Sequence, residues 1–343
     1  MAVILFCPKG IQPPTDYQRG VNRLADYTDR FLLDGLKRWE YSAAVKTLFR
    51  RKANGDVDVF GVFGEKPPAQ YTDASVHKEA IDRVIDGYKL EPKSHIWWVL
   101  GYKGPSPVRF EGFRGGQSPK YGGWAVANYD SRVVHLKAGT PVGTPLHREM
   151  ALKGMIHELG HAFRLPHIGP RYGLKYGNTL MGPTHANFRR VTGRFVKDGY
   201  LSQAAAAMLV AHPVLRGRRF ERRRVPQVRL SEGQISTDAK SGTVSVSGRV
   251  QSNLKPVFAI VADHSKKLPG TYWVRHYVSR IETDGQFEVE VTEPVKADGE
   301  YFLWFVFPSG ELTGNGRMQG TGERGATKIP YRFQNGRWVT ELK

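Results

Sequence analysis

Residues 157–167 combine side-chain types and spacings that can hold a metal ion. His157 and His161 lie four residues apart, so on a helix both imidazoles project from one face and can bind the same ion. Glu158 follows the first histidine and can reach a water on that ion. A third histidine, His167, comes after Pro166, and a proline favours an end of the helix before it. Three protein ligands with one open position are typical of a catalytic rather than a structural zinc ion.

Chance is a weak explanation for this pattern. Histidine is 11 of 343 residues, so His-Glu-x-x-His arises by chance in about one such chain in a hundred, and the third histidine lowers that more than tenfold. An ordinary helix with surface histidines is therefore the minor alternative. Because other divalent ions can occupy a site of three imidazoles, zinc is inferred from the ligand type.

The pattern resembles the metzincin clan of zinc peptidases, whose signature is His-Glu-x-x-His-x-x-Gly-x-x-His followed by a methionine-containing turn. The three histidines and the glutamate match position for position. A candidate Met-turn follows at residues 178–182, and the resemblance implies that Met181 lies beneath the metal as an apolar floor. An ordinary core methionine is the alternative. The sequence departs from the family at Arg164, where the family has glycine, and at Pro183, where some members have tyrosine.

The resemblance implies a zinc-dependent endopeptidase that hydrolyses peptide bonds with one ion bound through the three histidines. The ion would lower the pKa of its water toward 7 and polarise the scissile carbonyl. Glu158 would take the proton of the water and later deliver it to the leaving amine. Asp198 is the alternative third ligand. No glutamate occurs between Glu158 and Glu221, which disfavours the zinc peptidases that use a downstream glutamate.

The same resemblance implies where a peptide substrate would bind. Residues 124–129 form a predicted strand before the metal helix, at the sheet edge that lines the cleft in metzincins, where an extended peptide adds as an extra strand. An edge strand without a ligand is the alternative. Residues 183–188 would form the wall of the pocket for the side chain after the cleaved bond. The candidate substrate-binding residues are Trp124, Ala125, Val126 and His185; for His185, a surface or core histidine is the other interpretation.

The helix that carries the first two ligands is predicted to begin at Thr144 and Pro145, a cap followed by a proline at the first helical position. Its apolar stripe directs the histidines toward a cleft. His147 would lie on this helix about three turns before His157, too far to share the metal. The residues of the stripe are Leu152, Ile156, Leu159 and Phe163.

Apolar periodicity predicts a twisted mixed α/β sheet before this helix. The glycine-rich residues 112–123 lack the ending of a phosphate-binding loop and are predicted to be a surface loop. Residues 201–215 are predicted to be a core helix that closes the catalytic domain. The other predicted elements are a first strand over 2–6, a helix over 16–39, a hairpin of 46–51 with 57–63, a helix over 75–88 and a central strand over 95–101.

The end of the chain has a different character. Residues 216–229 hold seven arginines and one acid and are predicted to be a basic linker. About seven short alternating strands follow, with turn signals such as Asp284-Gly285, and they predict an immunoglobulin-like or fibronectin-like sandwich. The expected fold class is therefore an α/β (α+β) metzincin-like domain over 1–215, the linker over 216–229 and an all-β sandwich over 230–343. The expected strands are 242–250, 257–261, 272–278, 286–291, 300–307, 328–333 and 337–342.

Composition leaves two other classes of function open. A net charge of +19 favours anionic partners, so a nucleic-acid-associated protein, or a protease acting on DNA-bound proteins, is one alternative. A non-catalytic surface or adhesion protein with a structural metal site is the other. The single cysteine, Cys7, excludes an intramolecular disulfide and is expected to be a buried thiol, and no stretch is apolar enough to span a membrane. By family resemblance we expect an extracytoplasmic or secreted protein, with a cytoplasmic location left open; the oligomeric state is not indicated.

Overall fold

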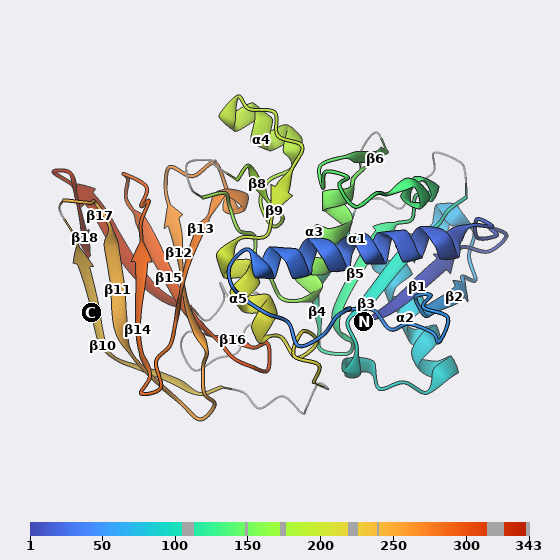
Figure 1. The fold of residues 1–343 in the computed structure, drawn as a ribbon, viewed down its shortest axis with the longest axis horizontal. Helices are drawn as coiled ribbons and strands as arrows, with labels where there is room; N and C mark the ends of the chain where they lie inside the picture. The colour runs from blue at the N-terminus through green and yellow to red at the C-terminus, as the bar shows by residue number, and fades with distance from the viewer. Residues whose placement is uncertain are drawn as a thin grey trace. The chain divides into compact units, whose positions relative to one another are not determined.

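The computed structural model describes residues 1–104, 113–147, 150–171, 176–218, 226–238, 240–313 and 326–340. Contacts within the chain divide it into two compact units, shown with their helices and strands in Figure 1. The N-terminal unit is Met1–Asp34 with Ala44–Arg164, and the C-terminal unit is Gly35–Ala43 with Leu165–Lys343. The predicted domain boundaries at 215 and 230 stay a prediction, and half of the predicted basic linker, residues 219–225, lies outside the described residues.

The N-terminal unit is built on a mixed five-stranded sheet in the order β2-β1-β3-β5-β4. Strand β4 is antiparallel to β5, and the other neighbours are parallel. The predicted mixed α/β layer is thus confirmed. Its elements are β1 (Ala2–Cys7), α1 (Tyr17–Lys37), β2 (Val59–Phe63), α2 (Asp73–Tyr88), β3 (Trp97–Gly101), β4 (Arg114–Ser118), β5 (Gly122–Asn128), β6 (Pro145–His147), β7 (Met150–Ala151) and α3 (Leu152–Ala162).

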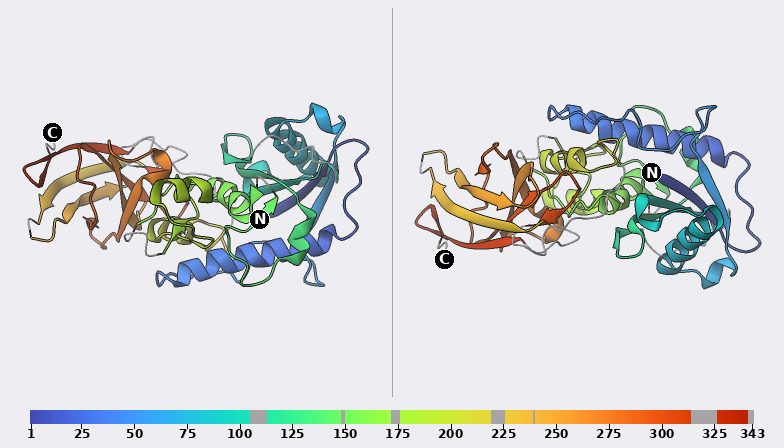
Figure 2. Two further views of the ribbon diagram at one scale, coloured as in Figure 1. Left: turned by 90° about the horizontal axis from the view of Figure 1, so that it is seen from above. Right: turned by 90° about the horizontal axis from the view of Figure 1, so that it is seen from below.

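Helices cover both faces of this sheet. Alternate residues of β1, among them Ile4 and Phe6, share one apolar cluster with Val76, Ile81 and Val84 of α2, since successive side chains of a strand point to opposite faces. Figure 2 shows α1 on the opposite side of the sheet from α2. Every residue of β3 is buried, as expected for a central strand covered on both faces, and this prediction is confirmed.

Two sequence predictions for this unit were wrong. The hairpin of 46–51 with 57–63 does not form: β2 pairs in parallel with β1, and only Arg51 and Val57 form an antiparallel bridge. The metal helix begins at Leu152 rather than near Pro145, which belongs to β6 together with His147. In the first case pairing with a distant strand overrode a local turn signal. In the second case the residues of the expected helix start pair with β7, directly before the helix.

The glycine-rich stretch is a strand hairpin and not the predicted surface loop. From Arg114 onward it forms β4, which pairs antiparallel with β5 and occupies the edge of the sheet. Helix α3 packs on these two strands. A Cβ on Gly115 would lie 2.0 Å from the carbonyl oxygen of Glu158, and one on Gly123 would lie 2.1 Å from that of Ala162. The glycines therefore permit the close approach of α3 to the sheet.

Substituting Gly115 by alanine is expected to lower the free energy of unfolding by about 1–3 kcal/mol, because the new methyl group overlaps the backbone of α3. The neighbouring Gly116 has no atom within 4 Å of its Cβ position, so Gly116→Ala is the matched control and should change stability by less than about 0.5 kcal/mol. Urea denaturation of both variants measures the difference. Equal stability of the two variants would contradict the close approach.

The C-terminal unit begins with short elements and continues as antiparallel sheets. A three-stranded sheet has the order β10-β11-β14, and a larger one has the order β13-β12-β15-β17-β18, with β16 paired to β15. Both contribute to one apolar core. The elements are β8 (Asn178–Thr179), α4 (His185–Thr192), β9 (Gly199–Tyr200), α5 (Gln203–Ala211), β10 (Val228–Thr237), β11 (Val244–Ser252), β12 (Phe258–Ser265), β13 (Arg275–Arg280), β14 (Gln286–Val291), β15 (Gly299–Val306), β16 (Leu312–Thr313), β17 (Thr327–Gln334) and β18 (Arg337–Thr340).

All seven predicted strands of this region occur, within a few residues of their expected bounds, and the predicted all-β character is confirmed. The sequence analysis missed β10 and the short β16. Helix α5 packs on β12 and β13 and is almost wholly buried, as the apolar stretch from residue 201 predicted. The single cysteine, Cys7, is a buried free thiol, and burial raises its pKa to about 12.

Two desolvated histidines, the buried His276 and the half-buried His264, make the C-terminal unit sensitive to acid. Burial lowers the pKa of His276 to about 3 and that of His264 to about 4, whereas both would titrate near 6.5 in the unfolded chain. At a pH between the folded and the unfolded pKa values, the unfolded state binds more protons than the folded state. The free energy of unfolding is therefore expected to fall as the pH drops below about 6.5, by about 2 kcal/mol at pH 5 for His276 alone.

Chemical denaturation at pH 7 and pH 5 measures this loss. Burial raises the pKa of Asp263, which acts in the opposite sense at lower pH, so the wild type is best compared with a variant at each pH. In His276→Gln the side chain does not titrate, and the loss of stability between pH 7 and pH 5 should be smaller. An identical loss in wild type and variant would contradict the assignment.

Among the described residues, no helix is both long and apolar enough to cross a membrane.

Candidate metal centre

Helix α3 positions the first two predicted ligands. Its stripe of Leu152, Ile156 and Leu159 is fully buried against the sheet, as predicted, and the helix is thereby fixed in rotation. His157 and His161 share another face, with ring centroids 4.7 Å apart and planes nearly perpendicular. His157 is buried and His161 is half-buried.

The chain turns sharply after α3, as the position of His167 requires. The Arg164 amide donates to the His161 carbonyl (2.9 Å), and Arg164 has a φ of 69°. This is the left-handed conformation that the glycine of the metzincin pattern would favour, and it costs a non-glycine residue about 1 kcal/mol or more. Gln117 of β4 supports the turn: it accepts a hydrogen bond from Arg164 Nε (3.2 Å) and donates to the Ala162 carbonyl (2.6 Å).

The turn brings the three histidines together. One nitrogen from each of His157, His161 and His167 can be chosen so that all lie within 4.8 Å of one another. Imidazole nitrogens bound to zinc at 2.0–2.1 Å in tetrahedral geometry are about 3.4 Å apart, so small side-chain movements close the site around an ion. Among the described residues no other group of potential ligands is as compact. Asp198, the alternative third ligand, is exposed and does not belong to the group.

Glu158 follows His157 directly on α3, and its carboxyl is in a desolvated position. Burial raises the pKa of its carboxyl to about 7, and a hydrogen bond from the Gly115 amide opposes the shift. A carboxylate with a pKa near the working pH can both accept and return a proton. The donor is an amide of β4, so the edge strand that supports the turn through Gln117 also holds the side chain of Glu158.

The residues after His167 are bonded to the predicted Met-turn. The Ile168 amide donates to the Met181 carbonyl (3.1 Å), and the Thr179 hydroxyl donates to the Ile168 carbonyl. Asn178 Nδ2 closes the turn by donating to the Pro183 carbonyl (2.6 Å). Met181 is buried, which suits an apolar floor. Its proposed position beneath the metal stays a prediction.

Tyr272 contacts a candidate ligand and, like Gly115 and Gln117, was not predicted from the sequence. The ring of Tyr272 stacks on His167, with centroids 3.8 Å apart and an interplanar angle of 27°. Tyr272 belongs to a 3₁₀ turn, Thr271–Trp273, just before β13. No local sequence pattern predicts this contact, because the two residues are far apart in the chain and meet only in the folded C-terminal unit.

The predicted substrate strand is not at the sheet edge. Strand β5 lies between β3 and β4, so the expectation that residues 124–129 form the edge of the sheet was wrong, and the edge belongs to β4. Trp124 stacks on His77 of α2, and Val126 is buried in the same apolar cluster. His185 begins α4, where its Nδ1 is hydrogen-bonded to the Val196 carbonyl (2.7 Å). Contact of these side chains and of Ala125 with a substrate stays a prediction.

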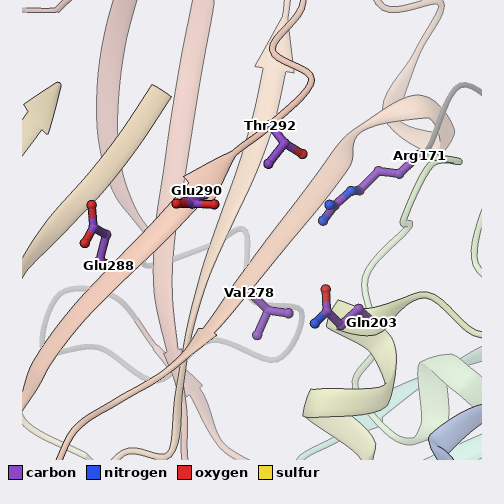
Figure 3. A pocket seen from close by; sticks show the side chains of 6 residues that line it. All are labelled: Arg171, Gln203, Val278, Glu288, Glu290 and Thr292. Carbon is purple, nitrogen blue, oxygen red and sulfur yellow. The ribbon is translucent and has the colours of Figure 1, made fainter. Parts of the chain in front are cut away.

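A polar cavity of about 320 Å³ lies in the C-terminal unit. Figure 3 shows Arg171 pointing into it from the segment that follows His167, opposite the carboxylates of β14. None of the predicted metal ligands lines it. The lining residues are Arg171, Gln203, Val278, Glu288, Glu290 and Thr292.

No protein-family model matches this chain, and no curated protein matches its sequence. Solved structures of OgpA from Akkermansia muciniphila are similar to it. Catalytically inactive OgpA in complex with an O-glycopeptide substrate, glycodrosocin, is 17% identical, with 99% of this chain and 95% of that chain covered and a TM-score of 0.72. Wild-type OgpA in two crystal forms is 18% identical, with 100% of this chain and 95% or 94% of OgpA covered and TM-scores of 0.72 and 0.70. At this identity the likeness concerns the fold alone: over nearly its whole length, the chain has the fold of OgpA.

Proposed function

We propose that this protein is a zinc-dependent endopeptidase that cleaves O-glycosylated peptides or proteins. The observation that carries the proposal is the convergence of His157, His161 and His167, and the half-buried Glu158 follows the first of them on α3. Three imidazoles next to a carboxylate are the donor set of a catalytic zinc site with one open position. The metzincin resemblance of the sequence and the fold of OgpA support the same reaction class.

The chain's own residues would divide the work as follows. The three imidazoles would hold the ion, which when bound supplies a Lewis acid that polarises the carbonyl and lowers the pKa of water. Glu158 would accept a proton from the attacking water and return it to the leaving amine. The Gly115 amide would keep the carboxylate of Glu158 oriented, and desolvation keeps the pKa of that carboxyl near 7.

The substrate would lie along β4. This strand is at the edge of the sheet, where an extended peptide can add by backbone hydrogen bonds with little dependence on its side chains. Specificity would then come from groups around the metal centre. The O-glycopeptide in the OgpA complex supports a glycosylated substrate here, and the half-exposed Tyr272 offers a ring of the kind that can pack on a sugar.

The test uses two synthetic peptides of one sequence, one carrying an O-linked sugar on a serine or threonine and one without it. The full chain loaded with zinc is expected to cleave the glycosylated peptide next to the modified residue, and the products are identified by mass spectrometry. Cleavage of both peptides at equal rates would support the peptidase activity but contradict a preference for glycosylated substrates. Cleavage of neither, and of no member of a mixed library, would contradict the peptidase.

The nucleic-acid alternative rests on the net charge and on the arginine cluster of residues 216–229. It expects DNA binding that weakens steeply with salt, and absence of binding at low salt would remove it. The non-catalytic surface protein expects bound metal without proteolysis, which the peptide library separates from an enzyme. An extracytoplasmic location, implied by the family resemblance, stays a prediction.

A further inference from the structure

We propose that Tyr272, in the turn before β13, is a positioning residue for the third candidate metal ligand, His167. This inference rests on the proposed metal site. It adds a residue that the His-Glu-x-x-His signature does not contain.

The need for such support follows from how each ligand is held. His157 and His161 extend from a buried helix whose rotation is fixed by packing. His167 lies in an irregular segment, residues 165–171, with no helix or strand of its own. An imidazole on such a segment can rotate and shift unless neighbouring groups hold it, and groups that orient a ligand contribute to metal affinity.

The turn that carries Tyr272 meets this segment at three successive points. The ring of Tyr272 stacks on His167 at 3.8 Å. The Gly169 amide donates to the Val274 carbonyl (2.6 Å), and Arg171 Nη1 donates to the His276 carbonyl (2.9 Å). Residues 167, 169 and 171 therefore lie alongside residues 272, 274 and 276.

Two further features make this contact specific. A Cβ on Gly169 would lie 2.4–2.7 Å from backbone atoms of Trp273, so only glycine permits this approach. The Arg171 guanidinium lies 4.1 Å from the centre of the Tyr277 ring, over the first strand after the turn. Backbone bonds thus fix the spacing between the two segments, and the Tyr272 ring then limits the orientations open to His167.

The experiment compares Tyr272→Ala with Tyr272→Phe in the full-length protein. Zinc affinity is measured by competition with a chromophoric chelator, and the ligand geometry is followed by the visible spectrum of the cobalt-substituted protein. We expect Tyr272→Ala to weaken zinc binding by about 10–100-fold, the range for loss of a group that orients a ligand, and to alter the cobalt spectrum. Tyr272→Phe retains the ring and should keep both readouts close to wild type.

Tyr88 provides a matched control, because it is an exposed tyrosine of α2 whose ring packs on Phe60; Tyr88→Ala should leave zinc affinity unchanged. Gly169→Ala tests the same contact from the other side and should weaken zinc binding as well. Unchanged zinc affinity in Tyr272→Ala, or equal weakening in Tyr272→Phe, would overturn the positioning role of the ring. If Tyr272→Ala does not fold, the zinc affinities of Tyr272→Phe and Gly169→Ala decide whether this contact positions His167.

Including His167→Ala in the same assay separates the two proposals. If that variant loses zinc while Tyr272→Ala keeps it, the metal site stands and only the positioning role fails. If His167→Ala binds zinc as tightly as wild type, the three-histidine site itself is wrong. Because these readouts measure metal binding, the result does not depend on knowing the substrate.

Discussion

Replacing Glu158 by glutamine is expected to lower the turnover of peptide substrate by about 10²–10⁴-fold, the usual contribution of a general acid–base group. The amide is nearly the same size as the carboxyl, so the close packing of α3 on β4 should be preserved. Zinc should stay bound at about one ion per chain, because Glu158 is not part of the three-histidine group. Single-turnover kinetics and metal analysis of the same sample measure both effects.

Glu91→Gln is a suitable control, because it makes the same change at an exposed carboxylate remote in sequence from the metal helix; its activity should equal that of the wild type. The pH profile adds an independent check. A group with a pKa near 7 that must be ionised makes activity rise with pH through that region, and this limb should disappear in the residual activity of Glu158→Gln. Full activity in Glu158→Gln would end the assignment of the base.

Replacing His167 by alanine is expected to weaken zinc binding by more than about 100-fold, since loss of a ligand should exceed the 10–100-fold effect of losing a group that orients one. Activity should fall with the metal content. The helix should persist, because its buried stripe does not involve His167. Metal affinity is measured by chelator competition, and far-ultraviolet circular dichroism checks the fold.

Two variants place this result in context. His135→Ala removes an exposed histidine and should leave the affinity for zinc unchanged. Asp198→Ala addresses the alternative third ligand and should also have no effect, because Asp198 is exposed and outside the three-histidine group. If Asp198→Ala loses zinc and His167→Ala retains it, Asp198 rather than His167 is the third ligand.

Much of the N-terminal unit could be predicted because its signals are local. The helices near 16–39 and 75–88 and the central strand near 95–101 occur close to their predicted bounds, since apolar periodicity reports directly which face is buried. Which strands pair is not a local property. The strand predicted over 57–63 pairs with β1 and not with the preceding segment of the chain. Four glycines between 115 and 123 favoured the prediction of a loop where the chain forms a strand and a turn.

The same distinction between local signals and long-range contacts applies to the metal centre. The sequence alone identified the three candidate ligands, because histidines four apart on a helix share one face and a break before His167 lets the chain turn back, and the fold brings the three side chains together. Only the tertiary structure could decide that β4 rather than β5 forms the edge of the sheet. The same holds for three supporting contacts: Gly115 with Glu158, Gln117 with the turn after α3, and Tyr272 with His167. These contacts join segments distant in the chain, and only packing of the whole fold selects which segments meet.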